Sequence, residues 1–282
     1  MRLYSVLFAA TSAALLLTSG TSHAGSSLTD ISLNYRLYVG GGKAAKVFLN
    51  ARLGEGKYSV EGQGKTTGTL GRLAKVHFSG VSTGRLDGVT IQPGNHEHRL
   101  QTKGRRGRHV VMAFDKNGKP KVSANPGFHY GRKRVPISPA HTLGTIDPVS
   151  SFIVPVKSGA SALHPSQCQR AAAIFDGQQR YDITLRHKAS YGAYKLKSAK
   201  YKGPAIRCVV SFRPVAGYKK SGFVPALARR SSNIDVVLVP AGEGQYLVPL
   251  RVRFPTPLGQ GVFQATNFNS KTVTRAAALR GD

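Results

Sequence analysis

The chain has 282 residues, 40% of them hydrophobic, with 41 Lys and Arg against 12 Asp and Glu, a formal net charge of +29 and two cysteines. Such a charge requires something negative nearby, and a chain of this length can bury a substantial core. The few acidic residues are spread thinly, which argues against catalysis by paired carboxylates.

The first element is a secretion signal. A charged start at Met1-Arg2 precedes a mostly apolar run from Leu3 to Leu17, and small and polar residues follow up to Ser22-His23-Ala24. This order is typical of a signal peptide with an A-x-A-like cleavage site. We therefore expect residues 1–24 to be removed and residues 25–282 to act in the periplasm as a single domain.

Export narrows the choice of partner for the positive charge. Nucleic acid is disfavoured outside the cytoplasm, which leaves anionic lipid, glycolipid, acidic polysaccharide or an acidic envelope protein. No later apolar run reaches the roughly 20 residues that a transmembrane helix needs, so we expect a soluble protein that can still contact a membrane peripherally. Scattered Lys and Arg that only maintain solubility are the alternative explanation.

The first third of the mature chain predicts a β-meander. Apolar residues alternate with polar ones from Ile31 to Val39, again from Ala45 to Leu53, and then from Tyr58 to Lys65. Gly40–Gly42 and the turn at residues 54–56 separate the three segments. Period-two alternation indicates strands with one buried face.

The rest of the chain predicts mostly strands with a few short helices. Helical spacing at residues 69–79, the Asp147-Pro148 start before residues 149–156, and residues 166–173 indicate the helices. The Asn117-Gly118 pair is typical of a hairpin turn, and Pro249 suits an edge strand. Strands are expected at residues 84–90, 96–102, 108–114, 119–124 and, most clearly, 246–254.

These elements predict a mainly β fold, a large curved antiparallel sheet or incomplete barrel with two or three short helices. A sheet of so many strands must curl or close. Its concave face would be apolar. That face either forms a core filled by its own side chains or holds a lipid-like ligand.

Two short motifs resemble catalytic or metal sites. Gly80–Gly84 matches G-x-S-x-G around Ser82, but a turn and strand follow where a nucleophile elbow requires a helix. His96 and His98 would share one face of a strand, yet further metal ligands are not evident. We predict no enzyme activity, no metal and no cofactor, and retain a serine hydrolase using Ser82 as the third hypothesis.

Two dense basic clusters are candidates for anion binding. If the sheet brings them together, they form a patch for phosphate or carboxylate, since the arginine fork binds such groups in a bidentate manner. Each could equally be a solvated loop. The first cluster is Lys103, Arg105, Arg106 and Arg108, and the second is Arg132, Lys133 and Arg134.

The two cysteines, Cys168 and Cys208, are expected to pair in an oxidising compartment. They are too far apart in sequence for a redox motif. The resulting bridge would stabilise the fold by about 4 kcal/mol on the chain-entropy model.

The segments that follow these cysteines resemble an exported proteobacterial family catalogued as domain of unknown function 3108. The likeness rests on residues 174–183, which read IFDGQQRYDI, on residues 213–218, which read RPVAGY, and on residues 145–150 and 247–252. It implies a β-rich periplasmic protein similar in outline to the open barrels of lipoprotein carriers and to β-spiral proteins, with an envelope role. The family motif residues are Asp176, Gly177, Arg180, Tyr181, Asp182, Gly217 and Tyr218.

The motif is also interpretable from its residues alone. Asp176-Gly177 predicts a turn, after which Gln179, Tyr181, Ile183 and Leu185 face inward. Arg180, Asp182 and Thr184 then face outward, where Arg180 and Asp182 can pair. Our first hypothesis is a non-enzymatic periplasmic protein that binds an anionic or lipid-like component, with the basic clusters at the head group. The runner-up is a packed scaffold whose basic surface docks an acidic envelope partner.

Overall fold

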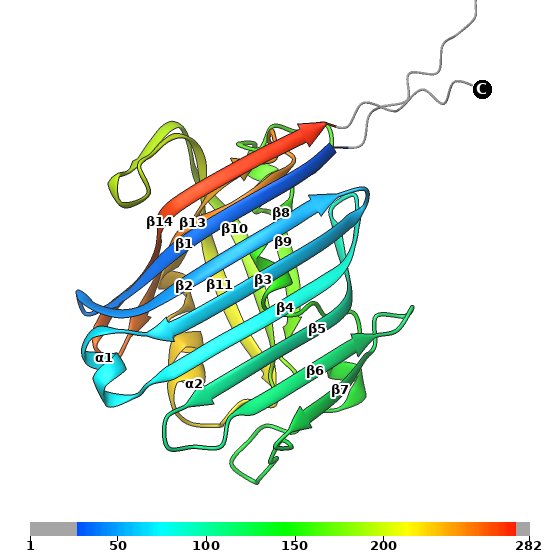
Figure 1. Ribbon diagram of the computed structural model, residues 1–282, viewed down its shortest axis with the longest axis vertical. Coiled ribbons are helices and arrows are strands. Elements are labelled where there is room, and N and C mark those ends of the chain that lie inside the picture. Colours follow the sequence, from blue (N-terminus) through cyan, green and yellow to red (C-terminus); the bar gives the residue numbers. More distant parts are fainter. Residues whose placement is uncertain (1–26, 275–282) are drawn as a thin grey trace, which may run out of the picture.

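The computed structural model describes residues 27–274, and the expected signal peptide lies outside that range. One antiparallel sheet of 14 strands makes up the fold, with strand order β7-β6-β5-β4-β3-β2-β1-β14-β13-β12-β11-β10-β9 and β8 paired to β13 (Figure 1). The curved, mainly β fold predicted from the sequence is confirmed. None of the helices among the described residues is long and apolar enough to cross a membrane.

Strands β1 to β7 form the first half of the sheet, each hydrogen-bonded to the next. The predicted meander is confirmed: alternation places Ile31, Leu33 and Tyr35 on the buried face of β1. The strands are β1 (Ser27–Val39), β2 (Gly42–Gly54), β3 (Lys57–Thr66), β4 (Val76–Asp87), β5 (Thr90–Thr102), β6 (Arg108–Phe114) and β7 (Pro120–Asn125).

The second half of the sheet contains a strand, β12, that is covered on both faces. In β12, Val236 and Leu238 pack into one apolar cluster while Val237 and Val239 pack into another on the opposite face. A continuous apolar run is typical of such a strand. The strands of this half are β8 (Val154–Pro155), β9 (Arg170–Phe175), β10 (Arg180–Leu196), β11 (Tyr201–Ala216), β12 (Ile234–Ala241), β13 (Tyr246–Thr256) and β14 (Gly259–Thr274).

The two halves face each other, and the chain between β7 and β8 runs between them (Figure 1). This connecting segment, residues 126–153, buries Val149 and Ile153 in the core that β1, β2 and β3 also share. Ile146 bridges to Ile174 of β9. In the described chain, the outermost strands β7 and β9 are not paired with each other, so the sheet curls without closing.

The predicted helices are mostly wrong. Residues 149–156 form only the 3-10 turn η2 (Ser150–Phe152) and then β8, because Pro155 cannot continue a helix and favours extended backbone before it. Residues 166–173 split between η3 (Pro165–Cys168) and β9, where pairing with β10 overrides local preference. The helix expected at residues 69–79 is shortened to α1 (Gly68–Leu73), since β4 already pairs with β5 from Val76.

Two strand predictions also require correction. Strands β4 and β5 are longer than expected, and residues 88–89, placed in a strand from the sequence, form the turn between them. Pro249 lies in β13, which is central rather than at an edge. It is tolerated there because the ladder shifts by a residue beside it and β14 pairs with β13 only from Arg251 onward.

One helix was not predicted at all. Helix α2 (Phe223–Arg229) follows β11 and packs against β11 and β13. The remaining 3-10 turns are η1 (Pro139–His141), η4 (Lys197–Ala199) and η5 (Ser231–Asn233).

Candidate functional site: an apolar pocket on the second half of the sheet

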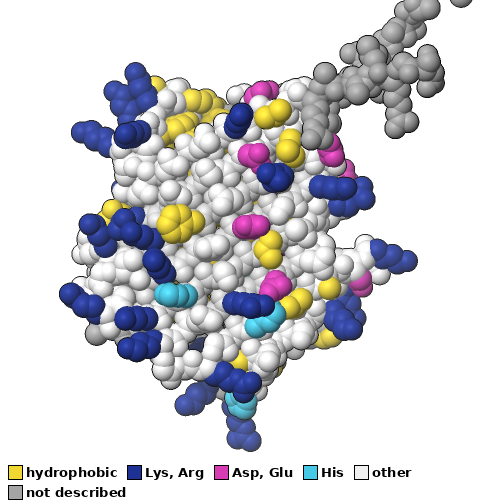
Figure 2. Space-filling view, viewed as in Figure 1, with side chains coloured by type: hydrophobic (Ala, Val, Ile, Leu, Met, Phe, Trp, Pro, Cys, Tyr) yellow, Lys and Arg dark blue, Asp and Glu magenta, His cyan; other side chains and the backbone are white. Residues whose placement is uncertain are grey.

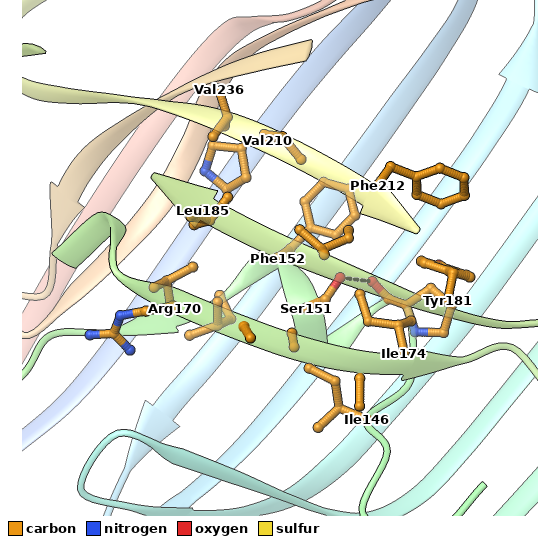
Figure 3. Close-up of a pocket in the computed structure, with 18 of the residues that line it drawn as sticks. Ile146, Ser151, Phe152, Arg170, Ile174, Tyr181, Leu185, Val210, Phe212 and Val236 are labelled. Atoms are coloured by element: carbon orange, nitrogen blue, oxygen red, sulfur yellow. Dashed lines mark hydrogen bonds between the residues drawn. The ribbon is translucent and has the colours of Figure 1, made fainter. Parts of the chain in front are cut away.

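A pocket of about 860 Å³ lies over one face of β9 to β13. Its floor is apolar because alternating residues of these strands point the same way, and Figure 3 shows them gathered around one space. The predicted inward alternation of Tyr181, Ile183 and Leu185 in β10 is confirmed, since all three line the pocket. Neighbouring strands add Ile174, Val210, Phe212, Val236 and Leu238.

The connecting segment forms a second wall of the pocket. Ile146, Phe152 and Ile153 line it, and they are held there by the bridge from Ile146 to β9 and by β8 pairing with β13. Phe223 and Leu227 of α2 contribute from the same helical face, because residues four apart lie one above the other. The pocket therefore arises from segments far apart in sequence.

Two cations border the apolar lining. Arg170 and Lys157 both line the pocket, and Figure 3 shows the Arg170 side chain directed away from the apolar group. Arg170 donates to the carbonyl oxygen and to Oε1 of Gln167, at 3.2 and 2.8 Å. Lys157 donates to the carbonyl of Gln169 at 3.3 Å. Within the described residues neither cation pairs with a carboxylate, so both can accept an anionic group.

A buried polar cluster fixes the connecting segment to the first half of the sheet. Asp147 is fully buried, and its Oδ1 accepts hydrogen bonds from the Ser82 hydroxyl at 2.6 Å and from the backbone N–H groups of Val149 and Ser150 at 2.9 Å. The Nδ1 atom of His96 lies 3.1 Å from the same oxygen. Asp147 thus caps the following turn, as its sequence position predicted, although no helix follows.

The geometry of this cluster differs from that of a catalytic triad. Ser82 Oγ and Asp147 Oδ1 both lie against Nδ1 of His96, at 2.7 and 3.1 Å, while His96 Nε2 faces His98 Nδ1 at 2.9 Å. A triad requires the serine and the carboxylate on opposite ring nitrogens. Ser82 is also 0% exposed. These contacts are those of a structural clamp between β4, β5 and the connecting segment.

The electrostatics of the cluster follow from burial and pairing. Burial opposes ionisation of Asp147, but hydrogen bonding and charge from His96, with the two serine hydroxyls, hold the pKa of its carboxyl below the usual value. Burial, and then the neighbouring His96, lower the pKa of His98 to about 4. The cluster is therefore built for an ionised Asp147 beside a neutral His98.

The structure brings the two basic clusters into one region but leaves them out of the pocket. Arg108 lies 4.9 Å from the centre of the Phe128 ring, and both Arg108 and Arg134 act on the phenol of Tyr130, although burial dominates its raised pKa. Arg134 bridges to Lys219, and the Lys220 N–H donates to the Lys133 carbonyl. Lys103, Arg105, Arg106 and Arg132 are exposed on the same loops, and none of the seven predicted residues lines the pocket.

The family motif mainly shapes turns around the pocket. Asp176 accepts hydrogen bonds from the backbone N–H groups of Gln178 and Gln179 at 2.8 and 2.6 Å, closing the β9–β10 hairpin. Gly177 has φ +91, and a Cβ there would lie 2.8 Å from Val110 of β6. Gly217 has φ +75 and would clash with the Gln178 carbonyl. The glycines thus allow this hairpin to pack against its neighbours.

The remaining motif residues form an ion pair, a backbone contact and part of the pocket. Arg180 and Asp182 form the expected ion pair at 2.7 Å, and Arg213 joins it from β11. The carbonyl of Tyr218 accepts from the Val135 N–H. Tyr181 alone reaches the pocket, and burial raises the pKa of its hydroxyl.

The predicted disulfide is present. Cys168 in η3 and Cys208 in β11 are joined, with Cα atoms 5.7 Å apart, and both are fully buried in the cluster that holds Ile206 and Leu247. The bridge fixes η3, and therefore the start of β9 at Arg170, against the central strands.

Comparison with known proteins places the chain in a family. A model of the family described as "Protein of unknown function (DUF3108)" matches residues 34–266. The chain belongs to the DUF3108 family. The match extends from β1 to β14 and so includes every strand that lines the pocket.

One solved structure is similar in outline to this DUF3108 chain. It is described as a beta-barrel-like protein of domain of unknown function DUF1849 from Brucella abortus. The two share 6% sequence identity over 86% of this chain and 98% of the other, with a TM-score of 0.46. No curated protein matches the sequence significantly.

Proposed function

We propose that this DUF3108 protein is a non-enzymatic periplasmic protein that binds a lipid-like molecule with an anionic head group. The observation that carries the proposal is the apolar pocket of about 860 Å³ with Arg170 and Lys157 at its border. Pockets of roughly 300–1,000 Å³ hold drug-sized ligands. The packed scaffold, our second hypothesis, would have no need of such a space.

An acyl chain fits the lining chemically. Aliphatic and aromatic side chains surround the space from β9 to β13, from β5, β8 and β14, and from the connecting segment and α2. Each buried methylene contributes about 0.8 kcal/mol, so ten buried methylenes would contribute about 8 kcal/mol before the costs of binding. A micromolar complex needs about 8 kcal/mol after those costs, so a longer chain or head-group contacts must offset them.

The head group is assigned to Arg170 and Lys157. The guanidinium of Arg170 is held by Gln167, so its fork is oriented before any ligand arrives. Burial lowers the pKa of Arg170, but the group stays charged because an arginine begins so far above neutrality. A phosphate or carboxylate beside Arg170 would accept hydrogen bonds in place of the water that the guanidinium loses on burial. This assignment differs from our expectation that the two basic clusters hold the head group, because those residues lie outside the pocket.

A fluorescence titration tests the proposal. A dansyl-labelled fatty acid should bind the purified mature protein with increased, blue-shifted emission, and Ala172→Trp should abolish the increase by filling the pocket. Ala172 lines the pocket on the same face of β9 as Ile174. The matched control is Thr184→Trp, an exposed position outside the lining. Equal binding by both variants would show that the probe does not use the pocket.

A hydrolase using Ser82 receives no support from the geometry. The Ser82 hydroxyl is buried and committed to Asp147 and His96. A substrate would have to displace the contacts that hold the connecting segment to β4 and β5.

A further inference from the structure

We propose that α2 and the basic loops beside it form a docking surface for an anionic membrane, through which a lipid enters the pocket. This inference rests on the proposed function, because it assigns the route by which the ligand arrives. Its basis is the position of α2, which contributes both to the pocket lining and to a basic end of the molecule. That end, called the basic end below, comprises the loops at residues 103–108, 126–134 and 217–222.

Direct contacts join these loops. Arg106 and Arg108 donate to Asn125 and Pro126 at the start of the second loop. Arg134 bridges to Lys219, and the Lys220 N–H donates to Lys133. In Figure 1 the β5–β6 turn, the chain after β7 and α2 all lie toward the lower left. The basic end is therefore one continuous surface.

The charge of this surface is of one sign. The three loops and α2 contain no Asp or Glu. Figure 2 shows Lys and Arg side chains along the left, lower and right edges of the molecule, whereas the acidic side chains in that view lie in the centre and toward the upper and right sides and not at the lower edge. A cation near an anionic leaflet gains about 1 kcal/mol, and the exposed cations at this end are Lys103, Arg105, Arg106, Arg132, Lys133, Lys219 and Lys220.

Apolar groups at the same end favour a membrane over an acidic protein. Phe223 is 49% exposed although it lines the pocket, and Tyr130, between the two basic clusters, is also 49% exposed. Helix α2 is flanked by Lys219 and Lys220 before it and ends at Arg229. A short apolar helix between cations, with exposed aromatic side chains, suits the interface of an anionic bilayer.

The shared position of Phe223 gives the route. Phe223 both lines the pocket and is exposed to solvent beside the basic end. When the basic end lies on a leaflet, an acyl chain can pass from the bilayer along Phe223 and Leu227 without crossing water. The order of events is docking by charge, then transfer by apolar contact.

Flotation with vesicles tests docking. The probe is a vesicle of three parts phosphatidylglycerol to seven parts phosphatidylcholine, compared with pure phosphatidylcholine. Wild-type protein should float only with the anionic vesicles, and Lys219→Glu with Lys220→Glu should weaken binding about twenty-fold or more, at about fivefold per cation removed. The control, Lys116→Glu with Lys119→Glu, makes the same charge change at the other end of β6 and should bind nearly as well as wild type.

The outcomes separate docking from ligand binding. If both double variants lost vesicle binding equally, net charge alone would explain the effect and the proposal would be overturned. Failure of the wild-type protein to float with anionic vesicles would also overturn it. Retention on heparin without flotation would assign the basic end to an acidic polymer and also overturn it. Phe223→Ser should slow transfer of the dansyl fatty acid to anionic vesicles at least threefold while the protein still floats. Flotation without any uptake of the probe would contradict the proposed function but leave docking standing.

Discussion

The clamp around Asp147 predicts a large loss of stability from one substitution. Asp147→Ala removes the acceptor for Ser82, His96, Ser150 and two backbone N–H groups in a site with no exposed surface. Breaking a buried charged network by removing one partner costs about 3–5 kcal/mol. For a domain of this size each kcal/mol lowers Tm by about 2–4 °C, so a decrease of about 6–20 °C is expected.

Urea unfolding at pH 7 in non-reducing buffer measures this loss. The matched control is Asp115→Ala, which also removes a carboxylate that caps backbone N–H groups, but in the exposed β6–β7 turn. It should cost only about 1 kcal/mol. A loss below about 1 kcal/mol for Asp147→Ala, or equal losses for the two variants, would refute the argument that the clamp holds the connecting segment in place.

Three further predictions concern stability. Cys208→Ala should lower Tm by about 10 °C in oxidising buffer, since the disulfide is worth about 4 kcal/mol; an unchanged melting curve would remove it from the account. Burial and the neighbouring His96 lower the pKa of His98 to about 4 in the folded chain. Between pH 6.5 and 4 this residue is therefore protonated more in the unfolded chain than in the folded one. The free energy of unfolding should fall by up to about 3 kcal/mol as the pH is lowered through that range. His98→Gln should flatten that dependence, and an unaltered slope would show that other groups cause it. Gly177→Ala should destabilise by more than about 1 kcal/mol in thermal unfolding, because φ is +91 and the new Cβ meets Val110; stability equal to wild type would contradict the close packing.

Local alternation was sufficient to predict the first three strands of the sheet. In β1, β2 and β3 one face is buried and the other is not, so period two is visible in the sequence. Strand β12 has no such period because both of its faces are covered, and it was not assigned. A helix prediction was wrong where strand pairing decided the structure. Residues 171–173 pair with β10, and this pairing overrides their local preference for helix.

Only one wall of the candidate pocket could be predicted from the sequence. The inward set in β10 was predictable, but the opposite wall depends on how residues 144–153 cross the sheet, which no local pattern encodes. Arg170 was missed because a lone arginine before three alanines has no motif. The pairing of Ser82 with His96 had only a partial signal, since a regular hairpin at residues 88–89 would place Ser82 opposite Asn95, and the register shift between Thr83 and Gly84 brings His96 opposite it instead. Their link to Asp147 had no such signal.

Native mass spectrometry of the protein released gently from its native cells tests the central claim most directly. The account predicts one lipid-like molecule for each chain, identified after extraction, and an empty chain for Ala172→Trp purified alongside Thr184→Trp, which should keep the lipid. An empty wild-type chain that also takes up no fatty acid or phospholipid when these are supplied would contradict the account and leave the pocket without a ligand.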